Sequence, residues 1–196
     1  MFQNSVLLTF TIFLSFTRAE YSSYYATCPE RYARTTIASC CTHPLLMPPV
    51  VMKSCLAVKL PPVVRGHVAP EKPHCQAECA LNMTKILTNK KFSAVRAKQV
   101  LTSRIPPKSE WSKLVEKAVN TCYKAFYVNP FDFHEDIKNN KTSSQCLPSA
   151  SLFLNCVIGI TYRDCPNASW IGGERCSEFI RTLMDCPYIF VQSTVY

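Results

Sequence analysis

The chain has 196 residues, of which 47% are hydrophobic and 18% charged, and its formal net charge is +9. A chain of this length fits one domain, which can bury roughly 70% of its extended surface. Only four glycines are present, Gly66, Gly159, Gly172 and Gly173. They leave no phosphate-cradling loop and no strained elbow around a serine, which excludes enzymes built on either motif.

The first 19 residues have the pattern of a signal peptide. Residues 3–16 are almost wholly apolar, and Thr17-Arg18-Ala19 places small residues where signal peptidase reads. We expect cleavage after Ala19, and therefore a secreted, extracellular protein with one domain over residues 20–196. Export accounts for twelve cysteines, because disulfides persist in an oxidising compartment, and it argues against a nucleic-acid partner. The secretory route also makes three tripeptides glycosylation candidates, at Asn82, Asn140 and Asn167.

The amino-terminal part of the mature chain is predicted to be a short helix followed by a proline-rich segment. Pro29 suits a first helical position, and residues 30–41 contain no helix breaker. Half of the chain's fourteen prolines lie within residues 44–73, which forbids a long helix there. The valines of this range indicate an extended segment packed on the body, which a bridge from Cys55 would hold in place.

Helical spacing returns with Cys75. Apolar residues recur every three or four positions from Cys75 to Leu87, so Cys75 and Cys79 lie on one helical face. A second helix is predicted over residues 93–101. A third opens at Ser109, whose hydroxyl can cap the first turn. The expected inner face of this third helix consists of Trp111, Leu114, Val115, Ala118 and Cys122.

A polar loop over residues 128–145 separates these helices from the last two. Ser149 is expected to cap an apolar helix over residues 150–160, which is too short to span a bilayer and is therefore a buried core helix. A final helix is predicted over residues 174–185, before an apolar tail. Since no strand pattern competes, the predicted fold class is all-α.

No group of residues supports a catalytic or metal site. Cys40-Cys41-Thr42-His43 is similar to the motif of secreted phospholipase A2, but that family has its histidine one position later and an aspartate after it, where Pro44 stands here. A histidine without an orienting group offers no catalytic tautomer. His74, Cys75 and Cys79 have the composition of a zinc site, but pairing into disulfides is the expected use of exported thiols. We expect no enzyme activity, no metal and no cofactor.

The later cysteines follow a specific spacing. Three residues separate Cys75 from Cys79, and the next gaps are 42 residues to Cys122, 23 to Cys146, nine to Cys156 and eight to Cys165, followed by Pro166 and nine more to Cys176. This ordered set resembles the Plus-C subclass of insect odorant-binding proteins. The resemblance covers residues 28–186.

The resemblance implies a compact disulfide-bonded bundle of about six or seven helices around an apolar cavity, with extended terminal segments and three interlocked disulfides. Carried over by position, two of these disulfides join Cys75 to Cys156 and Cys122 to Cys165, and the third joins Cys79 to either Cys41 or Cys55. The remaining six cysteines can pair in 15 ways. They are Cys28, Cys40, Cys146, Cys176, Cys186 and whichever of Cys41 and Cys55 is left.

The implied function is reversible carriage of small hydrophobic molecules such as odorants or pheromones. Burial of about 200 Å² of apolar ligand surface contributes about 5 kcal/mol, and one hydrogen bond in a preformed pocket brings the affinity toward the micromolar range. Core packing is the simpler role for each candidate wall residue. These candidates are Leu87, Leu114, Val115, Val119, Phe126, Phe153, Val157 and Ile160.

The second hypothesis rests on charge. Residues 85–124 contain ten cations and two acidic residues, a net charge of +8. Such a stretch attracts an anionic membrane, receptor or protein, although lysine-rich helix faces in solvent are the simpler explanation. The alternative function is thus a secreted basic interaction protein with a solid core. The sequence does not determine the oligomeric state.

Overall fold

The computed structural model describes residues 40–63, 72–125 and 146–185 and confirms the all-α prediction. Six α-helices lie within these ranges: α2 (Pro49–Leu56), α3 (Lys72–Met83), α4 (Ala94–Thr102), α5 (Glu110–Tyr123), α7 (Pro148–Arg163) and α8 (Glu174–Asp185). Two short strands, β1 (Leu87–Thr88) and β2 (Lys91–Phe92), and the 3-10 helix η4 (Asn167–Ser169) complete the described elements. None of these helices has both the length and the apolar character needed to cross a membrane.

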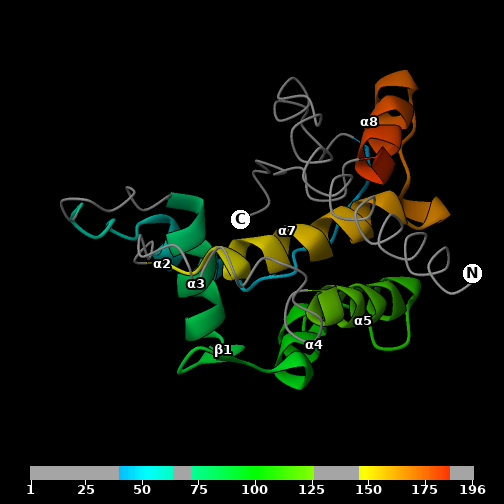
Figure 1. Cartoon of the computed structure of the whole chain (residues 1–196). Helices are drawn as coiled ribbons and strands as arrows, with labels where there is room; N and C mark the ends of the chain where they lie inside the picture. The colour runs from blue at the N-terminus through cyan, green and yellow to red at the C-terminus, as the bar shows by residue number, and fades with distance from the viewer. Residues whose placement is uncertain (1–39, 64–71, 126–145, 186–196) are drawn as a thin grey trace, which may run out of the picture.

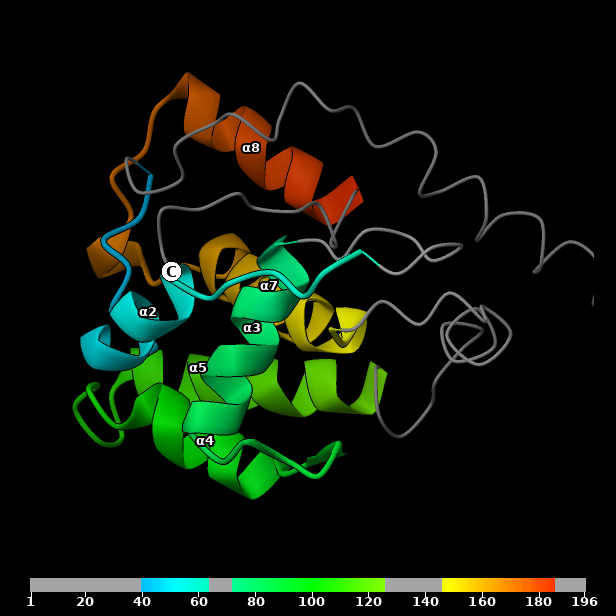
Figure 2. The same cartoon turned by 90° about the vertical axis from the view of Figure 1, so that its left-hand side faces the viewer.

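Helix α7 is the central element. Every residue from 151 to 159 is buried, and α7 packs against α3, α5 and α8. Figure 1 shows α7 crossing the middle of the molecule, with α4 and α5 on one side and α8 on the other, and Figure 2 shows the same arrangement from the side. The buried core helix expected at residues 150–160 is therefore confirmed.

The ends of α7 differ from the prediction. Ser149 is not its cap, because the helix begins at Pro148, a first-turn position that needs no amide hydrogen and suits the fixed φ of proline. The helix continues to Arg163 rather than Ile160. Thr161 and Tyr162 are both buried, so the last turn still has an inner face to pack.

Helix α2 contradicts the extended segment predicted for residues 44–73. Pro48 and Pro49 begin this eight-residue helix, and no further proline occurs before Pro61. Since proline is well tolerated in a first turn, the same residues that prevent a long helix start a short one. Val51 and Cys55 face the core from α2.

The hairpin β1–β2 was not predicted. Its strands pair antiparallel, with Leu87 opposite Phe92 and Thr88 opposite Lys91. The two turn residues, Asn89 and Lys90, have φ values of 50° and 61°, as the favoured two-residue hairpin turn requires. Strands of two residues show no alternating pattern, and Lys90 occupies the position where glycine usually signals such a turn.

Helices α4, α5 and α8 begin within one residue of the predicted positions. The helical face predicted from Cys75 to Leu87 is wrong at its end, because α3 stops at Met83, Lys85 has a φ of 59° and Leu87 lies in β1. The side chains of Ser93 and Ser109 accept hydrogen bonds from the backbone amides of Arg96 and Ser112, and so cap α4 and α5. Helix α8 has the predicted bounds.

Several predictions fall outside the described residues: the signal peptide, residues 30–39 of the first helix, the loop at 128–145 and the tail after 185. The two described residues of that predicted helix, Cys40 and Cys41, are not helical, because Cys41 forms an antiparallel β-bridge with Trp170.

Five disulfides join the described residues and correct the predicted pairing. They are Cys40–Cys176, Cys41–Cys165, Cys55–Cys79, Cys75–Cys146 and Cys122–Cys156. The predicted pairs Cys75–Cys156 and Cys122–Cys165 are wrong, and Cys55 is the one of the two candidate partners that Cys79 takes. Cys28 and Cys186 lie outside the described residues.

The error is a displacement by one cysteine along the chain. Cys156 lies in the middle of α7 and Cys165 lies beyond its end, about 13 Å further along at a helical rise of about 1.5 Å per residue. Cα atoms joined by a disulfide lie within about 7 Å of each other, so Cys122 can reach only one of the two. Its Cα lies 5.9 Å from that of Cys156. The packing of α5 on α7 therefore decides which cysteine pairs with Cys122, and the spacing of the cysteines along the chain does not.

Candidate functional site

The candidate wall residues gather in the apolar interior. Six of them belong to, or pack against, one core cluster: Leu87, Val115, Val119, Phe153, Val157 and Ile160. They come from β1, α5 and α7, so three elements contribute to one apolar region. Leu114 is buried but is not part of this cluster, and Phe126 lies outside the described residues. Whether these side chains contact a ligand remains a prediction.

Three aromatic rings extend this interior toward the hairpin. The ring of Phe92 on β2 meets Phe153 of α7 edge to face, with centroids 4.4 Å apart, and stacks on Tyr123 of α5 at 5.5 Å. Aromatic rings present large apolar faces that suit a small hydrophobic molecule. Phe92 and Tyr123 were missed by the sequence analysis. The only sequence signal for Phe92 is an aromatic residue in an otherwise basic stretch.

Disulfides hold the helices that carry these residues. Cys122–Cys156 joins the end of α5 to the middle of α7, and both cysteines are buried. Cys75–Cys146 ties α3 to the residues just before α7, and Cys55–Cys79 ties α2 to α3. In the loop-entropy model each such bridge stabilises by roughly 3 to 5 kcal/mol. The spacing of α3, α5 and α7 is therefore held covalently as well as by packing.

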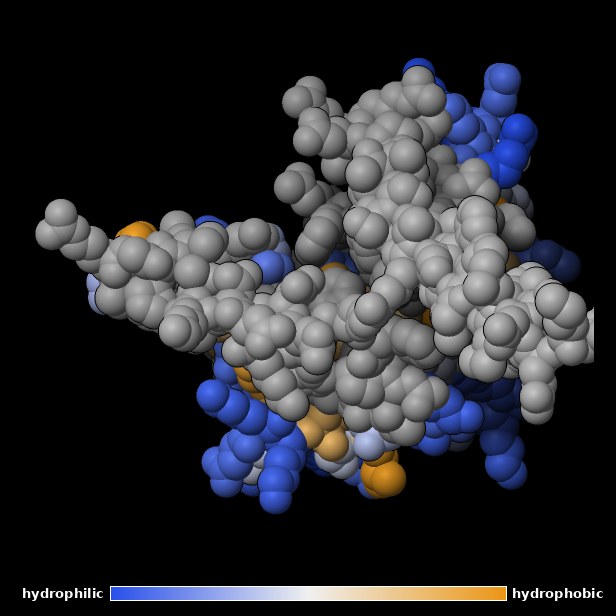
Figure 3. Space-filling model, viewed as in Figure 1, coloured by the Kyte–Doolittle hydropathy of each residue, from blue (hydrophilic) through white to orange (hydrophobic). Residues whose placement is uncertain are grey.

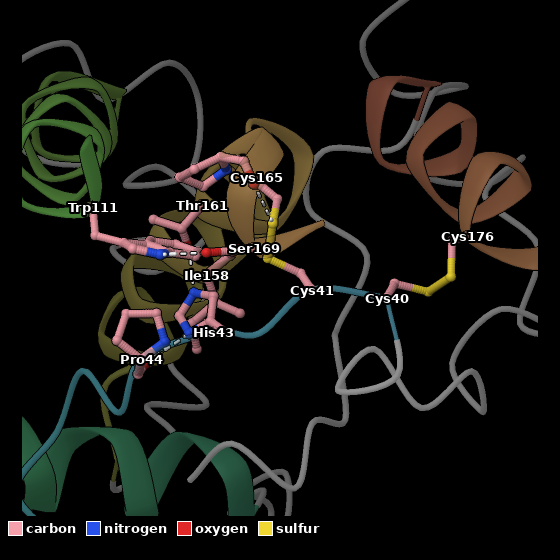
Figure 4. The surroundings of a disulfide bond; sticks show 11 residues. Cys40, Cys41, His43, Pro44, Trp111, Ile158, Thr161, Cys165, Ser169 and Cys176 are labelled. Carbon is pink, nitrogen blue, oxygen red and sulfur yellow. Dashed lines mark hydrogen bonds between the residues drawn. A yellow bond between two sulfur atoms is a disulfide. The ribbon is translucent and has the colours of Figure 1, made fainter. Parts of the chain in front are cut away.

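A second cluster surrounds His43. Its ring stacks on Tyr162, with centroids 4.4 Å apart, and meets Trp111 edge to face at 5.0 Å. Nε2 lies 2.8 Å from the Thr161 hydroxyl oxygen, and Nδ1 lies 2.8 Å from the Pro44 carbonyl oxygen. Figure 4 shows His43 beside the end of α7, with the Cys41–Cys165 bridge between its surroundings and the Cys40–Cys176 bridge.

The local backbone places His43 there. The Thr42 amide donates to the Ser169 carbonyl at 2.8 Å, and the Ile171 amide donates to the Cys40 carbonyl at 2.9 Å, so residues 40–42 pair antiparallel with residues 169–171. In an extended segment, residues two apart point the same way. Cys41 and His43 therefore both face α7 and the residues after it, while Cys40 points to α8.

The hydrogen bonds determine the state of the imidazole. A carbonyl oxygen only accepts, so Nδ1 carries the proton and donates to Pro44, and Nε2 accepts from the Thr161 hydroxyl. Burial lowers the pKa of His43 from 6.5 to about 4, although the bond to Pro44 opposes this shift. Burial also raises the pKa of Tyr162 to about 12. Both stacked rings are thus neutral at physiological pH.

This geometry serves structure better than catalysis. A hydroxyl beside an oriented imidazole is the arrangement of an activated nucleophile. Thr161, however, has no exposed surface, and its hydroxyl also lies 2.9 Å from the Ile158 carbonyl oxygen. The zinc alternative at His74 loses its thiolates, since Cys75 and Cys79 both form disulfides. Among the residues that the structure describes, no group of three potential ligands could hold a metal.

Comparison with known proteins supplies the family. A family model described as AgamOBP47-like matches residues 50–181, more than half of the chain. The chain belongs to this family of insect odorant-binding proteins. General odorant-binding protein 67 of Anopheles gambiae is 24% identical over 151 residues, which cover 73% of this chain and 70% of that protein. The twelve cysteines fit the Plus-C subclass, as the spacing predicted.

Membership of this family indicates a general class of function. Odorant-binding proteins are carriers of small ligands rather than catalysts. The matched residues 50–181 include nearly all of α2, all of α3 to α7 and most of α8, and so contain every candidate wall residue that the structure describes. Cys40, Cys41 and His43 lie before the matched range, so the match of the family model does not depend on these three residues.

Proposed function

We propose that this odorant-binding protein is an exported carrier that holds a small hydrophobic molecule, such as an odorant or pheromone, among the apolar side chains of β1, α5 and α7. The ligand binds reversibly and undergoes no chemistry. One observation carries the proposal: residues from these three elements converge on a single apolar cluster. The cluster belongs to helices that disulfides hold in place, in a chain whose family consists of carriers.

The chemistry of the interior supports an apolar ligand with few polar groups. Val115, Val119 and Phe153 have no exposed surface, and Val157 is 1% exposed. Burying about 200 Å² of ligand surface against them contributes about 5 kcal/mol, and a hydrogen bond adds about 1 kcal/mol. Together these contributions correspond to a dissociation constant of about 40 μM, which suits reversible carriage.

A matched pair of substitutions tests the site. Val157→Phe adds a ring to the proposed wall, while Val95→Phe makes the same change at a position that is 69% exposed on α4. We expect Val157→Phe to weaken binding of an apolar fluorescent probe at least tenfold, and Val95→Phe to leave it unchanged. Volatile alcohols, esters and aldehydes should displace the probe from the unmodified protein.

A smaller side chain guards against a folding artefact. Overfilling a packed core costs typically 1 to 3 kcal/mol, so circular dichroism and thermal unfolding must accompany each titration. Val157→Ala removes volume instead, and we expect it to keep the fold and to shift the preference toward bulkier ligands. Equal probe affinity in all three variants would show that the ligand does not bind among these residues.

A further inference from the structure

The segment that contains the hairpin and α4 is rich in cations and has no acidic residue. Residues 84–109 contain seven lysines and arginines and no aspartate or glutamate. Four of these cations surround the hairpin and are exposed: Lys85, Lys90, Lys91 and Arg96, named here the basic cap. No described carboxylate forms an ion pair with any of them, because the ion pairs between described residues all involve Asp164.

Backbone contacts bring the basic cap together. The Arg96 guanidinium donates through Nε to the Thr84 carbonyl at 2.9 Å, which places Arg96 beside Lys85. The Ser93 amide donates to the Ile86 carbonyl at 2.8 Å and closes the base of the hairpin whose turn holds Lys90. Figure 3 shows hydrophilic side chains projecting from the surface that covers the hairpin in Figure 1.

The backbone of the cap is unusual for lysine. Lys85 and Lys90 have φ values of 59° and 61°, a region that residues with a side chain seldom adopt and that glycine or asparagine fills more readily. Neither lysine forms an ion pair with a described carboxylate, so the positive charge at these positions is available to an outside partner. An exposed apolar side chain, Val95, lies next to Arg96 at the start of α4.

We propose that the basic cap docks the protein on anionic phospholipid membranes. Three of the four cations are lysines, which act as mobile point charges, and the Nε of Arg96 is already engaged by Thr84. Such a set suits the diffuse charge of a bilayer better than the paired geometry of a carboxylate on an acidic protein. Val95 adds an apolar contact that enters the headgroup region.

Only part of the basic stretch 85–124 belongs to the proposed docking surface. Lys117 on α5 pairs with Asp164 at 3.2 Å, so this lysine is satisfied within the fold. Lys108 and Lys113 lie at the opposite end of α4 from the hairpin, beyond Thr102. Docking therefore brings the hairpin end toward the membrane.

Vesicle co-sedimentation of the full disulfide-bonded protein tests the proposal. Each lysine near an anionic surface strengthens binding about fivefold. We expect binding to vesicles of 30% phosphatidylserine in phosphatidylcholine at about 0.1 M salt, and loss of binding at about 0.5 M salt, where screening is stronger. The double variant Lys90→Asn with Lys91→Gln should bind roughly twentyfold more weakly.

A matched control removes the same charge elsewhere. Lys108 has a φ of 63°, like Lys90, so Lys108→Asn with Lys113→Gln reproduces both the charge loss and the change at a left-handed residue. This control should lose less than threefold. Val95→Ser should weaken vesicle binding several-fold at constant charge.

Three results would overturn the proposal. They are equal binding to vesicles of pure phosphatidylcholine, equal losses in the two double variants, and tighter binding to polyglutamate than to vesicles of the same anionic concentration. The last result would assign the basic cap to an acidic protein. Displacement of the interior probe is measured separately on the same variants, so this proposal and the carrier function can fail independently.

Discussion

His43 has a structural role in the folded protein that its sequence context does not indicate. In the sequence it stands in a motif similar to that of secreted phospholipase A2, with no residue nearby to orient its ring. In the structure it lies between Tyr162 and Trp111 and bonds to Thr161, 118 residues away along the chain. No local pattern predicts this contact, because it forms only when residues 40–42 pair with residues 169–171.

The pKa of His43 predicts acid destabilisation. The folded protein holds the pKa at about 4, whereas an unfolded histidine has a pKa near 6.5, so the unfolded state binds more protons between these values. Stability is therefore complete above about pH 6.5 and falls as the pH decreases toward 4, by up to about 3 kcal/mol. Chemical unfolding at pH 7.5, 5.5 and 4 measures this loss.

His43→Gln is the control for that titration. Glutamine does not titrate, so this variant should be less stable at pH 7.5, through lost stacking, but should lose less further stability on acidification. If both proteins show the same difference in unfolding free energy between pH 7.5 and 4, protonation of His43 does not cause the acid sensitivity.

At the scale of elements, the five described disulfides are not equivalent. Cys122–Cys156 closes a loop of 34 residues between α5 and α7, and Cys40–Cys176 closes a loop of 136 residues that ties the segment before His43 to α8. The first bridge lies within the candidate site and the second outside it. The Cys40–Cys176 bridge should therefore contribute more to stability, because its loop is longer. The Cys122–Cys156 bridge should contribute more to ligand binding, because it lies in the candidate site.

Removing each bridge by paired alanine substitution should separate stability from binding. In the loop-entropy model, loss of Cys40–Cys176 costs about 5 kcal/mol and loss of Cys122–Cys156 about 4 kcal/mol. We nevertheless expect probe affinity to fall at least tenfold only in the Cys122→Ala and Cys156→Ala protein, because α5 is then free to shift against α7. Thermal unfolding and probe titration of both proteins are the measurements. The same loss of affinity in both would mean that the interior depends on overall stability alone.

The helices could be predicted from sequence where the signal is local. Serine caps at Ser93 and Ser109 and apolar spacing of three and four residues locate α4 and α5 to within a residue. The same spacing predicted six candidate wall residues that lie in or against the core cluster, although Leu87 belongs to β1 and not to a helix. The hairpin, α2 and the contact of Phe92 with Phe153 were not, because two-residue strands, an eight-residue helix after a proline pair and a contact across 61 positions leave no periodic pattern.

At the scale of the whole molecule, the sequence resemblance predicted the family and the helical class but not the disulfide register. Spacing between cysteines does not say which helices are neighbours, and a displacement by one position leaves every gap unchanged. Only the packing of α7 against α3 and α5 assigns Cys146 and Cys156 to their partners.

The proposed export makes a prediction for the mature molecule. Asn82 at the end of α3 and Asn167 in η4 are both exposed, so a glycan on either points away from the apolar interior. We expect protein secreted from insect cells to begin at Glu20 and to carry glycans at both sites. Mass spectrometry before and after enzymatic deglycosylation measures this, and Asn82→Gln and Asn167→Gln should each remove one glycan. An unchanged mass on deglycosylation would exclude the modification in these cells.

Cys40 and Cys41 are adjacent, so the choice of disulfide partner for each of them during oxidative folding sets how residues 40–42 align with residues 169–171. Their side chains face opposite ways, to Cys176 and to Cys165. If the two bridges exchanged partners, the segment would have to slip by one residue or turn over, and His43 would face away from Thr161. The aromatic contacts of His43 therefore favour one of two otherwise similar isomers. Correct pairing at the start of the domain can be followed by the environment of Trp111, whose ring meets His43 only in the native isomer.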